Sequence, residues 1–149
     1  MRVYITKKHA KKVVAGYPWV FKRHLIPLGH NDQIPRGSWV DVYDESGVFV
    51  GCGTFDIEAE IVLRMMSGTK IDSLCWLQRA LSNALQKREL QFPGGYYRWV
   101  YGESDQLGGL VIDRFAQYVC VQISTQGMWR LKGQIFQVIH ELISCRAII

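Results

Sequence analysis

Apolar and polar residues alternate in short runs over the first 67 residues, a pattern typical of β-strands. Strands are expected at 2–5, 19–21, 38–43, 48–55 and 61–65. Proline, glycine, asparagine and aspartate between 26 and 36 predict a loop, and 44–47 predicts the turn of a hairpin. In the strand at 38–43 the apolar members are Trp39, Val40 and Val42.

One short helix interrupts these strands, at residues 7–15. Thr6 can cap its start through the side-chain oxygen. Gly16 can end it in a left-handed conformation, and Pro18 prevents its continuation. Val13 and Val14 are expected to dock the helix on the strands.

The apolar spacing changes to three and four residues after 68–71, where we expect a hinge. A helix is predicted from 72 to 92, with its apolar positions on one face, at Leu74, Leu77, Leu81 and Leu85. Strands at 96–101, 110–115 and 118–124 and a final helix at about 128–143 follow. Residues 146–149 have the apolar pattern of a strand that the chain starts without finishing, as in a truncated domain. The fold class is therefore α+β.

Positive charge is concentrated at the start of the chain. The net charge of the whole chain is +5, but residues 1–31 contain no acidic residue. Their basic residues are Arg2, Lys7, Lys8, Lys11, Lys12, Lys22 and Arg23. Such asymmetry indicates a polyanionic partner, and nucleic acid before membrane. The helix at 7–15 would place four of the lysines in one wide stripe, which is either a phosphate-binding surface or a solvated face.

Aromatic residues adjoin this basic segment. Rings beside cations can stack on bases, and Tyr17 is a candidate for that role. Trp19 and Phe21 are interpreted as core residues, because alternation places them together on one face of a short strand.

Few residues suggest catalysis or metal binding. The cysteines occur singly, as is typical of small buried residues, at Cys52, Cys75, Cys120 and Cys145. The histidines lack metal-ligand spacing, and no glycine-rich phosphate loop is present. Glu103, Asp105 and Asp113 are interpreted as parts of a shaped loop, with an ion pair between Asp113 and Arg114. No secretory signal or membrane-spanning run is evident, so we expect a cytoplasmic protein without a membrane partner.

Several motifs, in order, resemble a family of S-adenosylmethionine-dependent large-subunit rRNA cytosine-5 methyltransferases. They are Lys8–Phe21, Gly37–Val42, Gly47–Gly53, Ile61–Arg64 and the signature segment Gly102–Arg114, in which Gln106 and Gly109 replace the usual glycine and proline. The resemblance spans nearly the whole chain. It implies a PUA-like RNA-binding barrel at 1–67 and an α/β middle domain at 72–149, truncated before a methyltransferase domain.

The family's chemistry has no counterpart in this sequence. In relatives a later domain carries the glycine-rich cofactor loop and a catalytic cysteine preceded by proline. None of the four prolines here precedes a cysteine. We therefore expect no catalytic residue, metal or cofactor in these residues, with S-adenosylmethionine implied only for a full-length relative.

The working hypothesis is electrostatic capture of ribosomal RNA without catalysis. The residues expected to contact RNA are Lys7, Lys8, Lys11, Lys12, Tyr17, Lys22, Arg23 and Arg64. Gly51 and Gly53 are expected to allow RNA to approach the backbone closely. The alternative is a protein-interaction module, such as a homodimer formed through the leucine face of 72–92 or through the final helix.

Overall fold

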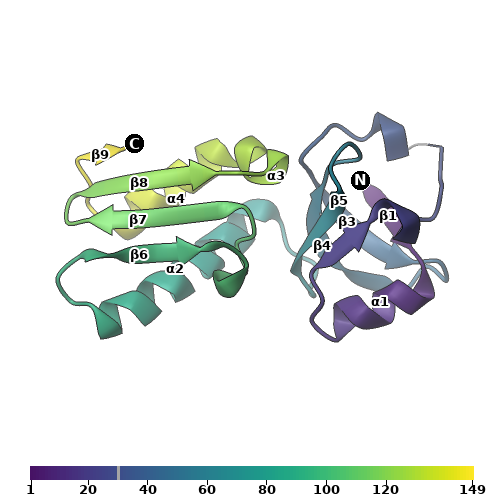
Figure 1. The fold of residues 1–149 in the computed structure, drawn as a ribbon, viewed down its shortest axis with the longest axis horizontal. Coiled ribbons are helices and arrows are strands. Elements are labelled where there is room, and N and C mark those ends of the chain that lie inside the picture. The colour runs from purple at the N-terminus through teal and green to yellow at the C-terminus, as the bar shows by residue number, and fades with distance from the viewer. Residues whose placement is uncertain (30) are drawn as a thin grey trace. The chain divides into compact units, whose positions relative to one another are not determined.

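The structure is a computed structural model that describes residues 1–29 and 31–149. His30, in the predicted loop, lies outside the described residues. The chain forms two compact units, Met1–Asp72 and Ser73–Ile149. Both combine helices with a sheet, so the predicted α+β class is confirmed (Figure 1).

The first unit is a curled five-stranded sheet in the order β1-β3-β4-β5-β2. Its strands are β1 (Arg2–Ile5), β2 (Trp19–Phe21), β3 (Ser38–Asp44), β4 (Phe49–Phe55) and β5 (Ile61–Ser67). Its helices are α1 (Lys7–Val14) and the 3-10 turns η1 (Lys22–His24) and η2 (Asn31–Gln33). β1 pairs in parallel with β3, whereas the other pairs are antiparallel. All five predicted strands are present.

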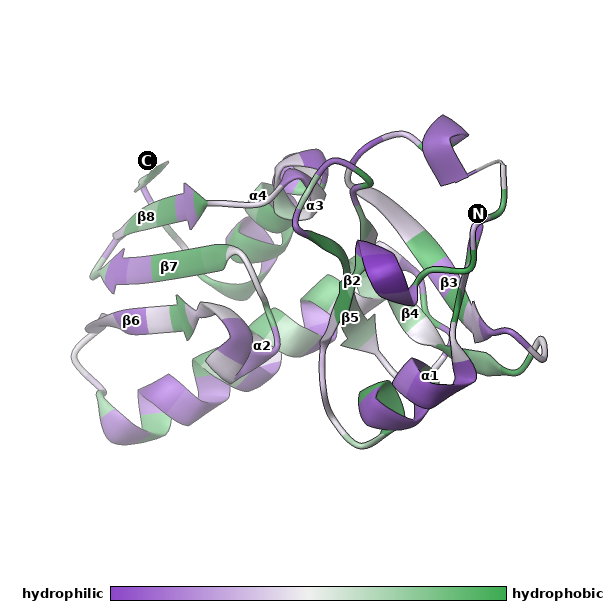
Figure 2. Ribbon diagram, turned by 45° about the vertical axis from the view of Figure 1, so that its right-hand side comes forward, coloured by the Kyte–Doolittle hydropathy of each residue, from purple (hydrophilic) through white to green (hydrophobic). Residues whose placement is uncertain are grey.

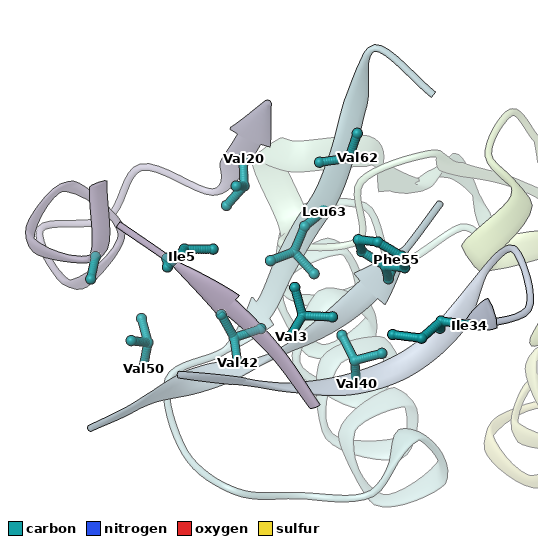
Figure 3. Packing of buried hydrophobic residues seen from close by; sticks show 11 residues of the cluster. Val3, Ile5, Val20, Ile34, Val40, Val42, Val50, Phe55, Val62 and Leu63 are labelled. Atoms are coloured by element: carbon teal, nitrogen blue, oxygen red, sulfur yellow. The ribbon is translucent and has the colours of Figure 1, made fainter. Parts of the chain in front are cut away.

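The core of the first unit lies inside the curl of this sheet. Its fully buried members include Val3, Ile5, Val20, Val42, Phe55, Val62 and Leu63 (Figure 3). Most of them alternate along their strands, because successive side chains of a strand point to opposite faces. Val62 and Leu63 are neighbours in β5 and are both buried. In β3 the alternation selects Val40 and Val42 and leaves Trp39 half-buried on the other face. The Trp39 indole N–H donates there to the Ile71 carbonyl oxygen at 3.0 Å.

The segment expected to be a hinge belongs to the first unit. Lys70 forms an ion pair with Asp41 at 3.1 Å, and the Ser67 hydroxyl donates to the Thr69 carbonyl oxygen at 2.9 Å. These contacts, with the Trp39–Ile71 bond, hold 68–71 against the β-strands. The division between the two units accordingly follows Asp72.

The second unit is a four-stranded sheet in the order β6-β7-β8-β9, with helices on one face (Figure 1). Its strands are β6 (Tyr96–Tyr101), β7 (Leu110–Phe115), β8 (Tyr118–Ile123) and β9 (Ala147–Ile148). Its helices are α2 (Ser73–Gln91), η3 (Gly102–Asp105), α3 (Gln126–Arg130) and α4 (Lys132–Leu142). The strand expected at the end of the sequence is present as β9, which pairs in parallel with β8.

The leucine face of α2 is part of the second unit's own core. Leu77, Leu81 and Leu85 are buried there, and the Trp99 indole N–H donates to the Leu81 carbonyl oxygen at 3.0 Å. The apolar side of α4 is buried as well. These two faces are therefore unavailable for the dimer contact that the sequence suggested.

Two local expectations for the second unit were wrong. The final helix is broken at Leu131, whose ψ of 2° interrupts the helical run between α3 and α4. Cys75 and Cys120 are exposed and Cys145 is half-buried, so among the cysteines only Cys52 is buried. Cys120 lies on the exposed face of β8, whereas its neighbour Val119 lies on the buried face. The apolar residues on either side of Cys120 do not show which face it occupies. Burial raises the pKa of the Cys52 thiol.

Candidate nucleic-acid interface

Backbone contacts set the ends of α1. Thr6 occupies the capping position, but its side chain forms no capping hydrogen bond, contrary to expectation. Its amide N–H instead donates to the His24 carbonyl oxygen at 2.9 Å, which ties the helix start to η1. At the other end Gly16 has a φ of 102°, the left-handed conformation expected of it.

Three residues attach α1 to the sheet. His9 and Ala10 are buried, and Val13 packs partly buried against the core. Val14 is 76% exposed, so its predicted docking role was wrong. At 100° per residue, positions 9, 10 and 13 share one arc of the helix whereas position 14 lies outside it.

The opposite arc of α1 carries the four predicted lysines, Lys7, Lys8, Lys11 and Lys12, all exposed. Most of the α1 ribbon is accordingly hydrophilic in Figure 2. We call these four side chains the lysine stripe. The helix has no acidic residue, and within residues 1–29 and 31–149 no stripe lysine forms an ion pair. The nearby Glu45 carboxylate accepts only from the Lys7 backbone N–H, at 3.3 Å. The stripe is therefore an uncompensated positive surface that a polyanion would neutralise.

A stack of two imidazole rings borders the lysine stripe. The rings of His9 and His24 lie 3.7 Å apart between centroids and nearly parallel. The edge of Tyr17 meets His9 at 5.9 Å, and Tyr17 in turn contacts Trp19 at 6.0 Å. The His9 ring Nε2–H donates to the Trp19 carbonyl oxygen at 2.8 Å, which satisfies this buried polar side chain. The stack connects α1 to β2 and η1.

Arg23, the last basic residue of the acid-free N-terminal segment, lies against the same group of rings. The Arg23 guanidinium lies over the Phe21 ring at 5.2 Å, and Phe21 meets His24 edge-on at 5.9 Å. Lys22 and Arg23 are both exposed on η1. The structure therefore brings Tyr17 and Arg23 to one aromatic and basic surface beside Lys12. His9 and His24 also belong to this group of rings, a role that their positions in the sequence do not predict.

Trp19 and Phe21 are not the core residues of β2. Both are half-buried, whereas Val20 between them is fully buried and lies opposite Leu63. The predicted alternation is correct, but the buried face is the one that carries Val20 and not the one that carries Trp19 and Phe21. The sequence of a three-residue strand indicates that its residues alternate but not which face points inward. Trp19 lies opposite Arg64 on the neighbouring strand, so Arg64 reaches the outer edge of this surface.

Gly51 and Gly53 serve a different purpose from the one expected. Both are buried in β4. A Cβ atom would collide with the Ser67 carbonyl oxygen at Gly51 and with the Arg64 carbonyl oxygen at Gly53. The close approach is therefore made by the neighbouring strand β5 and not by an external ligand.

Two carboxylates of 102–114, Asp105 and Asp113, form ion pairs, and the partner of Asp113 differs from the expected one. Asp105 accepts two hydrogen bonds from Arg88, at 3.0 and 2.8 Å. Asp113 pairs with Arg98, its partner across β6 and β7, and not with Arg114. Neighbours in a strand point to opposite faces, which excludes the pair that the sequence suggested.

His24 gives this surface a pH dependence of stability. Burial, followed by the nearby charges of His9, Arg23 and Lys12, lowers the pKa of His24 below its ordinary value of 6.5. Between the lowered pKa and about 6.5, the unfolded chain binds more protons than the folded one, so the free energy of unfolding falls as pH falls. Urea unfolding at pH 7.5 and 5.5 should show a smaller difference for His24→Gln than for the unsubstituted chain. An equal difference in both proteins would contradict this prediction.

Within the described residues no group of three or more His, Cys, Asp or Glu side chains could hold a metal ion. No described helix is long and apolar enough to cross a membrane. The glycine-rich segment Gly102–Gly109 joins two antiparallel strands. A nucleotide-binding loop joins a strand to a helix, so this segment does not fit S-adenosylmethionine.

Comparison with known proteins identifies the first unit. Residues 3–68 match the family model of the PUA-like domain. These residues form a PUA-like domain.

Curated relatives extend the similarity to the second unit. A ribosomal RNA large subunit methyltransferase I from Vibrio vulnificus is 28% identical over 144 residues, covering 94% of this chain and 36% of the relative. The Alteromonas mediterranea enzyme of the same name is 29% identical over 147 residues, with 95% and 36% covered. The chain is thus homologous to large-subunit rRNA methyltransferases and spans about a third of their length.

Solved structures share the fold. A Streptococcus mutans protein assigned as a SAM-dependent methyltransferase superposes with a TM-score of 0.78 at 16% identity, over 95% of this chain and 38% of that one. A methyltransferase structure in complex with SAH superposes at 0.76 with 15% identity, over 95% and 37%. At this identity the likeness concerns the fold alone.

Proposed function

We propose that this chain is the RNA-binding portion of an rRNA cytosine-5 methyltransferase-like protein, acting in the cytoplasm. It captures ribosomal RNA electrostatically and performs no methyl transfer by itself. The observation that carries the proposal is the lysine stripe on the helix of a PUA-like domain, four exposed cations without a carboxylate partner among the residues that the structure describes. S-adenosylmethionine would belong to other parts of a full-length relative.

The surface beside the stripe supports RNA as the polyanion. Phosphates would neutralise the lysines and release counterions. Tyr17 is exposed beside the stacked histidines, and Arg23 lies over the Phe21 ring. Aromatic rings next to cations stack on unpaired bases. Arg64 extends the basic surface past Trp19.

Binding to a single-stranded large-subunit rRNA fragment tests the proposal. The variant Lys8→Gln/Lys12→Gln removes two charges next to the histidine stack and should weaken binding about tenfold, because two phosphate contacts are lost. Arg130→Gln/Arg146→Gln removes the same charge from exposed positions of the second unit and serves as the matched control. Equal affinity of both variants would contradict the proposal, as would methyl transfer by the purified chain supplied with S-adenosylmethionine.

A further inference from the structure

A polar pocket of about 90 Å³ lies between α2 and the segment after β6, within the second unit. Its polar lining residues are Arg79, Asn83, Lys87, Ser104, Asp105 and Gln106. A water molecule needs only about 10–15 Å³ of such space. The pocket therefore has room for several waters or for one tetrahedral oxyanion.

The charge in this pocket is positive. Arg79, Asn83 and Lys87 are four residues apart and so share one face of α2. Within the described part of the chain, neither Arg79 nor Lys87 forms an ion pair. The single carboxylate in the lining, Asp105, is neutralised by its two hydrogen bonds from Arg88 and also accepts from the Tyr101 backbone N–H at 2.8 Å. Two cations are left to attract an anion.

The loop side of the pocket holds a residue in an unusual conformation. Gln106 has a φ of 62°, in the left-handed region that favours glycine. Glutamine is strained in this conformation, whereas glycine would not be. Strained residues of this kind concentrate at ligand sites. Here the strain is accompanied by an amide side chain that lines the pocket beside Ser104.

We propose that this pocket binds a phosphate group. Arg79 and Lys87 supply the charge, and the Asn83 and Gln106 amides and the Ser104 hydroxyl donate hydrogen bonds to the remaining oxygens. The phosphate can be part of an RNA backbone or of a small phosphate compound, since both present the same oxygens. The inference does not rest on the lysine stripe, which belongs to the other unit.

Titration with inorganic phosphate, followed by NMR at the side-chain amides of Asn83 and Gln106, tests the proposal. Sodium chloride at equal ionic strength is the reference. We expect a saturable shift of both signals, with affinity reduced about tenfold for each cation removed in Arg79→Gln/Lys87→Gln. Arg130→Gln/Arg146→Gln is the matched control and should bind phosphate as tightly as the unsubstituted chain. Gln106→Gly should relieve the backbone strain and raise the urea midpoint, yet bind phosphate more weakly.

A second titration, with oligouridylate, distinguishes the sources of the phosphate. Saturation at a lower concentration of oligonucleotide than of phosphate assigns the pocket to RNA, and the reverse order assigns it to small phosphates. Absence of a saturable shift with either probe would overturn the proposal. Equal weakening in the pocket variant and its control would also overturn it. The amide signals of Asn83 and Gln106 report on this pocket alone, so failure of RNA capture by α1 would leave the phosphate response intact.

Discussion

Asp105→Asn is expected to lower the free energy of unfolding by about 3 kcal/mol, the cost of breaking a buried ion pair from one side. The Asp105 side chain is only 3% exposed and that of Arg88 only 21%. The carboxylate accepts from Arg88 and from the Tyr101 backbone N–H, and Arg88 also donates to the Arg98 carbonyl oxygen at 3.0 Å. An amide in place of the carboxylate turns an N–H group toward these donors and leaves Arg88 uncompensated.

Asp113→Asn provides the matched control for this prediction. Its ion pair with Arg98 has similar geometry, at 2.8 Å, but the two side chains are 26% and 50% exposed. Exposed pairs contribute less than about 1 kcal/mol, because water and salt screen them. Urea unfolding of both variants measures the difference, and equal losses would show that burial does not set the strength of these pairs.

The strands and the long helix could be predicted from the sequence because their apolar residues repeat with the period of each element. All nine predicted strands and the helix α2 are present, most within two residues of their expected limits. The break at Leu131 was not predictable in this way. The apolar spacing of three and four continues through it, from Met128 to Ile135, although the backbone does not remain helical.

The inner face of short elements was harder to predict than their position. Trp19 and Phe21 are larger than Val20, yet only Val20 is fully buried. Val14 is apolar but lies outside the arc of α1 that meets the sheet. In both cases the deciding factor is the packing of β2 and α1 on distant residues such as Leu63, which local sequence does not contain.

The candidate site was predictable in its charge but not in its construction. The lysine stripe follows from helical spacing alone. The stacking of His9 on His24 could not be predicted, because it joins residues that are 15 positions apart through the approach of α1 to η1. Their place in the sequence could still have marked both histidines as candidates, since they lie within the acid-free segment of residues 1–31.

The alternative function is a protein-interaction module, and the structure offers it a surface other than the two helix faces that the sequence suggested. The leucine face of α2 is buried, but Tyr96, Phe115 and Tyr118 are exposed and neighbour one another across β6, β7 and β8. Self-association through these rings would be insensitive to salt and to the charge of α1. RNA binding by the lysine stripe should instead weaken as the salt concentration rises and when the charge of α1 is reversed.

The largest effect on RNA affinity is expected from reversing the whole lysine stripe. Lys7, Lys8, Lys11 and Lys12 lie on one arc of α1, so a single RNA strand can contact all four side chains. The quadruple Glu variant replaces attraction by repulsion at each phosphate. We expect its affinity to fall by about two orders of magnitude or more at physiological salt.

The dependence of RNA affinity on salt, measured for the unsubstituted chain and for the quadruple Glu variant, tests the central claim most directly. Contact with four to six phosphates of single-stranded RNA predicts a slope of log affinity against log salt of about −3 to −4. The variant should retain a slope of about −1, from the cations of η1 and β5. A flat, weak dependence that is the same in both proteins would contradict electrostatic capture and favour the protein-interaction function.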